Sequence, residues 1–112
     1  MRHAFGRGAV DRERIFAALD AYLLAGFLFG VAYWTLERLW PGSFGGGAAG
    51  QFDFPHAIYF SFVTIATLGY GDVVPVSPPA RGLAIVEGIS GQMYLAVLVA
   101  RLVSLYARDP DA

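Results

Sequence analysis

The sequence contains no cysteine and no lysine, and it carries little charge of either sign. Without cysteine the chain can form no disulfide, no thiolate metal site and no cysteine nucleophile. Its cysteine content therefore does not indicate whether it resides in an oxidising or a reducing compartment. Only 15% of the 112 residues are charged, whereas a soluble domain averages roughly 25%. The net charge of −1 argues against a protein that binds nucleic acid. The shortage of charge points to a membrane protein.

Apolar residues dominate what is present. The chain is 56% hydrophobic and 15% aromatic, and its mean hydropathy is +0.52. A chain of this composition does not stay solvated, so intrinsic disorder is excluded for most of it. The length predicts one domain with room for two membrane spans and a short segment between them. No room is left for a separate catalytic domain, so we expect neither an enzyme nor a resident cofactor.

Two long apolar stretches predict membrane-spanning helices. The first covers residues 15–36, contains Asp20 as its one charged residue, and follows a polar segment at residues 1–14. It is longer than the roughly 7–15 apolar residues of a signal peptide, and it reaches the roughly 20 residues that cross a bilayer. The second covers residues 82–100 and contains one charge, Glu87. We therefore interpret both stretches as retained spans.

The arginines predict the orientation of these spans. Four arginines precede the first span, two lie at or beyond the end of the second, and only Arg38 and Arg81 lie between. Positively charged residues stay on the cytoplasmic side, so both termini are expected in the cytoplasm and the central segment outside the cell membrane. Trp34 and Trp40 suit anchoring at the membrane interface. For Tyr22, anchoring and packing are equally good interpretations.

A short apolar segment separates the two spans. It covers residues 54–68, which is too short to cross a bilayer, and a glycine-rich loop, WPGSFGGGAAG, precedes it. Asp53 can serve as the N-cap of a helix here, and Pro55 fits its first turn. Residues 69–72 read GYGD and cannot continue a helix; residues 73–79 form an extended connection with three prolines. A helix that enters the membrane and breaks must line a cavity or be buried in protein.

The residues at which this segment stops being helical could bind a cation through their backbone carbonyl groups. The sequence TIATLGYGD at residues 64–72 alternates two glycines with larger residues, so Gly69 and Gly71 can adopt a positive φ. Carbonyl groups that alternate in a strand can then all face one side, with a hydroxyl from Thr67 at the inner end. The ring of Tyr70 can point away and brace the backbone. Four such loops around an axis would replace the hydration shell of a potassium ion.

This motif, placed between two spans, resembles the pore module of potassium channels, in particular the bacterial type with two transmembrane helices. The family signature is matched at Thr64, Thr67, Gly69, Tyr70, Gly71 and Asp72. The resemblance covers residues 15–107 and implies an all-α membrane protein in which two transmembrane helices flank a re-entrant pore helix and selectivity-filter loop, assembled as a fourfold tetramer. The implied parts are a cytoplasmic segment at 1–14, an outer helix at about 15–39, a turret loop at 40–52, a pore helix at about 54–66, a filter at 67–71, an inner helix at about 81–106 and a cytoplasmic tail at 108–112.

The resemblance also implies the roles of single residues. The carbonyl groups of residues 67–70 would bind dehydrated K+, the Thr67 hydroxyl would form the innermost site, and Gly71 would complete the filter. Thr64 belongs to the segment that supports the filter. Asp72 would concentrate cations at the outer mouth and anchor the filter by hydrogen bonds.

The chain departs from the family pattern at three places. Leu68 replaces a residue that is often Val or Ile, which changes the packing behind the filter and leaves the carbonyl unchanged in kind. Val63 stands where some bacterial members have a glutamate that pairs with the aspartate matching Asp72, so that pair cannot form. Tyr59 and Phe60 replace tryptophans that brace the filter in many members; aromatic bulk is kept and the indole N–H groups are lost.

Three residues of the second span are further candidates. The resemblance implies that Gly91, or Gly88 as a second candidate, acts as a hinge for the inner helix; close helix packing is the alternative and explains much of the pattern of small residues. Glu87 is an intramembrane carboxylate and therefore a functional candidate. We expect it to hydrogen-bond the filter or the pore helix from outside the conduction path, with proton sensing as the lesser alternative.

The expected function is passive, K+-selective conduction by a homotetramer in contact with membrane lipids. K+ is the permeant ligand, and no other metal site and no nucleic acid partner are expected. Two alternatives stay open: a weakly selective cation channel, and a non-conducting membrane subunit. The gating stimulus and any regulatory partner are not specified by these residues. The chain begins with Met and ends in a polar tail, which suits a complete small protein, but a pore module within a longer protein would look the same.

Overall fold

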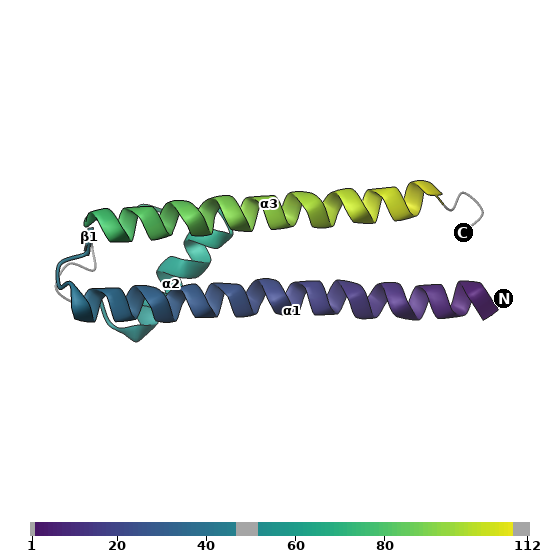
Figure 1. The fold of residues 1–112 in the computed structure, drawn as a ribbon, viewed down its shortest axis with the longest axis horizontal. Helices are drawn as coiled ribbons and strands as arrows, with labels where there is room; N and C mark the ends of the chain where they lie inside the picture. Colours follow the sequence, from purple (N-terminus) through teal and green to yellow (C-terminus); the bar gives the residue numbers. More distant parts are fainter. Residues whose placement is uncertain (1, 47–51, 109–112) are drawn as a thin grey trace.

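The computed structural model describes residues 2–46 and 52–108. The elements follow in the order α1 (Arg2–Leu39), β1 (Phe44–Gly46), α2 (Phe54–Ile65), β2 (Val73–Pro75) and α3 (Pro78–Arg108). The long helices α1 and α3 run in opposite directions, so the start of α1 and the end of α3 lie at the same end of the molecule (Figure 1). The short helix α2 lies between them in the other half (Figure 1). Two long helices that flank a short one were predicted, and this arrangement is confirmed.

Both long helices are apolar enough to cross a membrane, over Arg12–Leu39 and Pro78–Ser104. The first helix, however, begins at Arg2 and not near residue 15 as predicted. The polar segment before residue 15 contains good helix formers, and its two glycines weaken a helix without ending it. At 38 residues α1 is about 57 Å long, whereas the hydrocarbon core of a bilayer is about 30 Å thick. The first turns of α1 therefore extend beyond the membrane.

The short helix α2 begins and ends where its sequence predicts. Asp53 has extended backbone angles, and its side chain accepts a hydrogen bond from the backbone N–H of His56 at 3.1 Å, which confirms it as the N-cap. Pro55 occupies the first turn. The helix ends at Ile65, one residue before the predicted end. With 12 residues it is about 18 Å long, so it enters the membrane region and cannot cross it.

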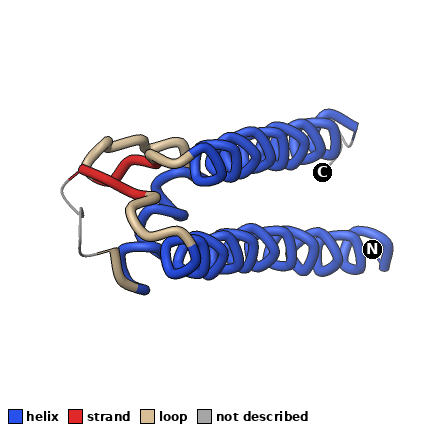
Figure 2. The backbone as a smooth tube through the Cα atoms, turned by 60° about the vertical axis from the view of Figure 1, so that its left-hand side comes forward, coloured by secondary structure: helices blue, strands red, loops and turns tan. Residues whose placement is uncertain are grey.

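The segment before α2 and the segment after the filter pair as a small antiparallel sheet, which was not predicted. Phe44 pairs with Pro75, and Gly46 pairs with Val73, at the end of the molecule away from the chain ends (Figure 2). A Cβ atom at Gly46 would lie 2.5 Å from the carbonyl oxygen of Asp72, so only glycine lets the strands approach this closely. The predicted turret loop is thus partly a strand, β1.

The inner helix also begins earlier than predicted, at Pro78 and not near residue 81. The Ser77 hydroxyl accepts a hydrogen bond from the backbone N–H of Ala80 at 3.2 Å. Proline needs no hydrogen-bond partner in the first turn of a helix, so Pro78 and Pro79 start α3 well. Pro78 and Pro79 therefore mark a helix start, whereas the predicted extended backbone is confirmed at Val73–Pro75, the strand β2.

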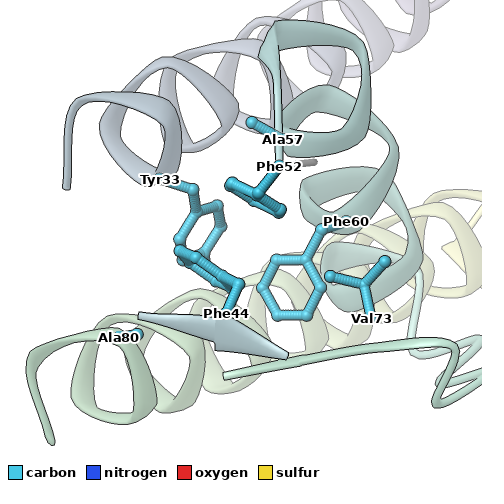
Figure 3. Close-up of a cluster of buried hydrophobic side chains, with 7 residues drawn as sticks. All are labelled: Tyr33, Phe44, Phe52, Ala57, Phe60, Val73 and Ala80. Atoms are coloured by element: carbon cyan, nitrogen blue, oxygen red, sulfur yellow. The ribbon is translucent and has the colours of Figure 1, made fainter. Parts of the chain in front are cut away.

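A cluster of buried aromatic and small side chains holds together the half of the molecule that contains α2 and the two strands (Figure 3). Its members are Tyr33, Phe44, Phe52, Ala57, Phe60, Val73 and Ala80. The rings of Phe44 and Phe52 stack at 4.0 Å, and the rings of Tyr33 and Phe60 meet edge to face at 4.9 Å. This cluster joins α1, both strands, α2 and α3, so it fixes α2 against the rest of the chain.

Two glycines let α1 approach α2 closely. A Cβ atom at Gly26 would lie 2.6 Å from the ring of Phe62, and one at Gly30 would lie 2.5 Å from Ile58 Cδ1. Glycines spaced four residues apart are a known means of close packing between membrane helices. This spacing is visible in the sequence GFLFG at residues 26–30, but the contact was not predicted. The close approach is what brings the hydroxyl group of Ser61 in α2 within reach of α1.

Candidate functional site

The segment that follows α2 adopts an alternating backbone. Thr67, Gly69 and Gly71 have positive φ angles of 57°, 60° and 80°, and Leu68 and Tyr70 between them do not. The positive φ angles of the two glycines were predicted and are confirmed. The left-handed conformation of Thr67 was not predicted, because a β-branched residue rarely adopts it. Left-handed and ordinary residues therefore alternate over five positions.

The last carbonyl groups of α2 hold the inner end of this segment. The carbonyl oxygen of Val63 accepts hydrogen bonds from the backbone N–H groups of Leu68 at 2.9 Å and Gly69 at 3.4 Å. The carbonyl of Thr64 accepts from the N–H of Thr67 at 3.1 Å. Val63 thus supports the segment through its backbone, while its side chain is buried. The position of α2 directly sets the position of the residues after it.

Tyr59 holds the outer end of the segment. Its hydroxyl donates a hydrogen bond to Asp72 Oδ2 at 2.7 Å, and Asp72 Oδ1 accepts from the N–H of Val73 at 3.1 Å. The hydrogen bond to Asp72 raises the pKa of the Tyr59 phenol, which therefore stays neutral. From the sequence we noted only that indole N–H groups are lost at Tyr59 and Phe60. The structure shows that the tyrosine hydroxyl supplies a donor, while Phe60 is buried in the aromatic cluster.

The side chains of the alternating segment are largely uncovered in the single chain. Leu68 is 56% exposed and Tyr70 is 66% exposed. The hydroxyl of Thr67 donates to the carbonyl of Ala66 at 2.6 Å. The roles in K+ binding given to residues 67–71 stay predictions.

A buried carboxyl group lies behind this segment. Glu87 of α3 is fully buried; Tyr33 Oη of α1 lies 2.7 Å from its Oε1 atom, and Ser61 Oγ of α2 lies 2.6 Å from its Oε2 atom. Ser61 Oγ also lies 2.5 Å from the carbonyl oxygen of Gly26 in α1. The predicted hydrogen bond between Glu87 and the short helix is confirmed. Ser61 and Tyr33 were missed, because nothing local in the sequence links them to Glu87.

A second hydroxyl of α1 reaches the end of the short helix. Tyr22 Oη donates to the carbonyl oxygen of Ile65 at 2.8 Å, and its ring stacks on that of Tyr94 at 5.9 Å. The hydroxyl of Tyr94 in turn donates to the carbonyl of Ala18 at 2.7 Å. Of the two interpretations offered for Tyr22, the structure favours packing. The tyrosine satisfies a carbonyl group that the end of α2 would otherwise leave without a partner.

The two glycines proposed as a hinge lie in different surroundings. A Cβ atom at Gly91 would lie 2.7 Å from Ile65 Cγ1 and 2.8 Å from the backbone oxygen of Ile65, whereas nothing lies within 4 Å of such an atom at Gly88. Gly91 thus allows α3 to pack directly on the last turn of α2. A hinge at either position stays a prediction, and α3 is continuous through both.

Comparison with known proteins gives consistent results. Residues 18–108 match a protein family described as "Ion channel". The inward rectifier potassium channel Kirbac3.1 of Paramagnetospirillum magnetotacticum is 33% identical over 91 residues, which is 78% of this chain and 28% of that protein. Two pore potassium channel c of Oryza sativa subsp. japonica is 34% identical over 88 residues, 75% of this chain and 19% of that protein. The chain therefore spans less than a third of these relatives' length.

Similarity of structure extends over most of the chain. The crystal structure of a voltage-gated K+ channel pore module, in a closed state in lipid membranes, superposes with a TM-score of 0.61. The match covers 88% of this chain and 98% of the pore module, at 22% sequence identity, so it bears on the fold. Because the family match covers most of the sequence, this chain belongs to the ion channel family and has the fold of a potassium channel pore module.

Proposed function

We propose that four copies of this chain assemble in a membrane into a channel that conducts K+ selectively and passively. The observation that carries this proposal is the alternation of positive φ angles at Thr67, Gly69 and Gly71, directly after α2. Such an alternation allows successive carbonyl groups to turn to one side. A column of carbonyl oxygens can replace the hydration shell of K+.

The need for four copies follows from the geometry of ion coordination. One chain supplies one column of carbonyl groups, and a ring of carbonyls at each level is required to surround an ion. The exposed side chains of Leu68 and Tyr70 are consistent with a segment that neighbouring copies cover. The two relatives described above are both named as potassium channels, which supports K+ as the permeant ion.

The orientation in the membrane follows from the arginines. The start of α1 and the end of α3 lie on the same side of the molecule, and these two segments carry six of the eight arginines. Because positive residues are retained in the cytoplasm, this side is the cytoplasmic one in the proposal. The filter and the paired strands then face the outside of the cell membrane.

The test combines stoichiometry with ion flux. Native mass spectrometry of the purified protein should give a tetramer, and the tetramer in liposomes should release K+ and retain Na+. Gly69→Ala places a side chain at a φ of 60° and should abolish selective flux. Gly82→Ala is the matched control, because this glycine is helical and has nothing within 4 Å, so flux should persist.

Three outcomes would contradict the proposal in different ways. A tetramer that passes Na+ as readily as K+ would favour the weakly selective channel. A tetramer that passes neither ion under any condition of pH or voltage would favour the non-conducting subunit. A stable monomer or dimer in lipid would remove the basis for a shared filter.

A further inference from the structure

Glu87 connects all three helices at a single point. Its carboxyl group on α3 contacts Tyr33 of α1 through Oε1 at 2.7 Å and Ser61 of α2 through Oε2 at 2.6 Å. Ser61 Oγ continues the chain of contacts to the carbonyl oxygen of Gly26 on α1, at 2.5 Å. These three distances are all within the normal range of O–H···O hydrogen bonds. Each of the three contacts therefore needs one hydrogen atom.

The number of available hydrogen atoms decides the protonation state of this group. Tyr33 and Ser61 carry one hydroxyl hydrogen each, and the carbonyl group of Gly26 carries none. If Glu87 were ionised, two hydrogens would have to serve three contacts, and two oxygen lone pairs would face each other across one of the Ser61 contacts. If Glu87 carries a proton on Oε2, all three contacts are satisfied. Tyr33 then donates to Oε1, Oε2–H donates to Ser61, and Ser61 donates to Gly26.

Among the described residues, none places a compensating positive charge next to Glu87. Within the described part of the chain, its contacts are hydroxyl groups from α1 and α2, and the ion pairs include none with Glu87. The titratable groups facing it are Tyr33 and, farther along α1, Tyr22, whose hydroxyl is bonded to Ile65. α2 contributes only the non-titrating Ser61, and the nearest charged residues on α3, Arg81 and Arg101, are exposed. An isolated buried carboxylate is costly, which favours the neutral form.

We propose that Glu87 is a positioning residue that is held as a neutral carboxylic acid, and that its proton fixes the re-entrant helix against both membrane helices. This proposal rests on the proposed function, because the helix it fixes carries the filter. Loss of the proton to water leaves Ser61 with one hydrogen for two acceptors, so either its bond to Gly26 or its bond to Glu87 breaks. The carbonyl group of Val63, two residues beyond Ser61, accepts the backbone hydrogen bonds that hold the filter segment. Release of the proton therefore loosens the filter.

The protonation state is tested directly by infrared spectroscopy in lipid at neutral pH. The difference spectrum between wild type and Glu87→Gln should contain the carbonyl stretch of a protonated carboxylic acid, which is lost in the variant. Bands of an ionised carboxylate in its place would overturn the proposal. This readout does not require the protein to conduct ions, so it separates a failure of this inference from a failure of the proposed function.

The positioning role is tested by the pH profile of K+ flux. Glutamine at position 87 reproduces the hydrogen count without titrating, because its amide oxygen can accept from Tyr33 and its NH2 group can donate to Ser61. Flux through wild type should fall between neutral and strongly alkaline pH, while flux through E87Q should stay flat. Ser61→Ala removes the bond to Gly26 and should show reduced flux at every pH. An alkaline decline shared by E87Q, or a wild-type profile as flat as that of E87Q, would overturn the role of the proton.

Discussion

At the scale of single residues, hydroxyl groups decide how the re-entrant helix is held. The Tyr22 hydroxyl donates to the last carbonyl group of α2, and the Ser61 hydroxyl joins α2 to α1 and α3. The Tyr59 hydroxyl connects α2 to Asp72. Hydrogen bonds of this kind satisfy backbone and carboxyl groups that lipid cannot solvate. The segment after α2 is thus held by side-chain hydroxyl groups.

The Tyr59 hydroxyl yields a first prediction. Tyr59→Phe removes the hydrogen bond to Asp72. We expect the tetramer to unfold at a higher temperature in K+ than in Na+, and this difference should be smaller in Y59F, because a loosened filter binds K+ less well. Tyr94→Phe is the matched control, since it removes a hydroxyl bond to Ala18 away from the filter. Thermal unfolding in K+ and in Na+ measures both variants. Equal K+ increments in Y59F and wild type would contradict the role of this bond.

The N-cap of α2 yields a prediction about pH. Hydrogen bonds from the side chain and backbone of His56 hold the pKa of the Asp53 carboxyl below its usual value. The stabilisation is therefore complete above the usual carboxyl pKa and is lost as the pH falls through the lowered value. Asp53→Asn keeps an acceptor that does not titrate, so wild type should be the more stable of the two near neutral pH. The difference in unfolding free energy between the two proteins should disappear in acid. A difference that persists in acid would count against the account.

At the scale of elements, the close approach of helices rests on glycine. Gly26 and Gly30 bring α1 onto α2, and Gly91 brings α3 onto the end of α2. Because all three contacts converge on the one helix that cannot span the membrane, the position of α2 is determined from both sides. The aromatic cluster adds the third support at the outer end.

The contrast between two glycines of α3 can be tested. Gly91→Ala forces a Cβ atom to within 2.8 Å of the backbone oxygen of Ile65 and should lower the unfolding free energy, by about 1–3 kcal/mol for an overpacked contact. Gly88→Ala meets open space and should be neutral or stabilising by up to about 1 kcal/mol. Thermal or denaturant unfolding in detergent would measure both. Equal losses in the two variants would argue against packing as the reason for Gly91.

Local signals explain which elements the sequence could predict. The signals that bound α2 act over a few residues; they are Asp53, Pro55 and the GYGD break. The predicted bounds of α2 therefore agree with the observed bounds to within one residue. The pairing of β1 with β2 depends on register across roughly thirty residues, and FGG has no strand pattern of its own. The early start of α1 was missed because polarity was interpreted as an interruption, although polar residues also form helix outside a membrane.

The same distinction between local signals and contacts made by distant residues applies to the candidate site. The positive φ angles of Gly69 and Gly71 follow from residue type alone, whereas that of Thr67 depends on its bonds to the end of α2. The bond between Tyr59 and Asp72 crosses the break in the helix, so no helical spacing indicates it. The contacts of Glu87 come from two other helices, and only the fold brings them together.

At the scale of the whole molecule, the absence of cysteine makes the orientation easy to test. Pro41, just after α1, and Ser104, near the end of α3, are exposed. The ends of these two helices lie at opposite ends of the molecule (Figure 1). Single Pro41→Cys and Ser104→Cys variants provide one thiol each in a chain that has none. A membrane-impermeant maleimide should label P41C in intact cells and S104C only after permeabilisation. The reverse pattern would contradict cytoplasmic termini.

The central claim is that the alternating segment, repeated four times, forms a K+-selective filter. Its most direct test is the reversal potential of the reconstituted tetramer with K+ on one side of the bilayer and Na+ on the other. The account predicts a reversal potential close to the K+ equilibrium potential, a current that barium blocks, and loss of this selectivity in Gly69→Ala. A robust current that reverses near zero in the wild-type protein would contradict it.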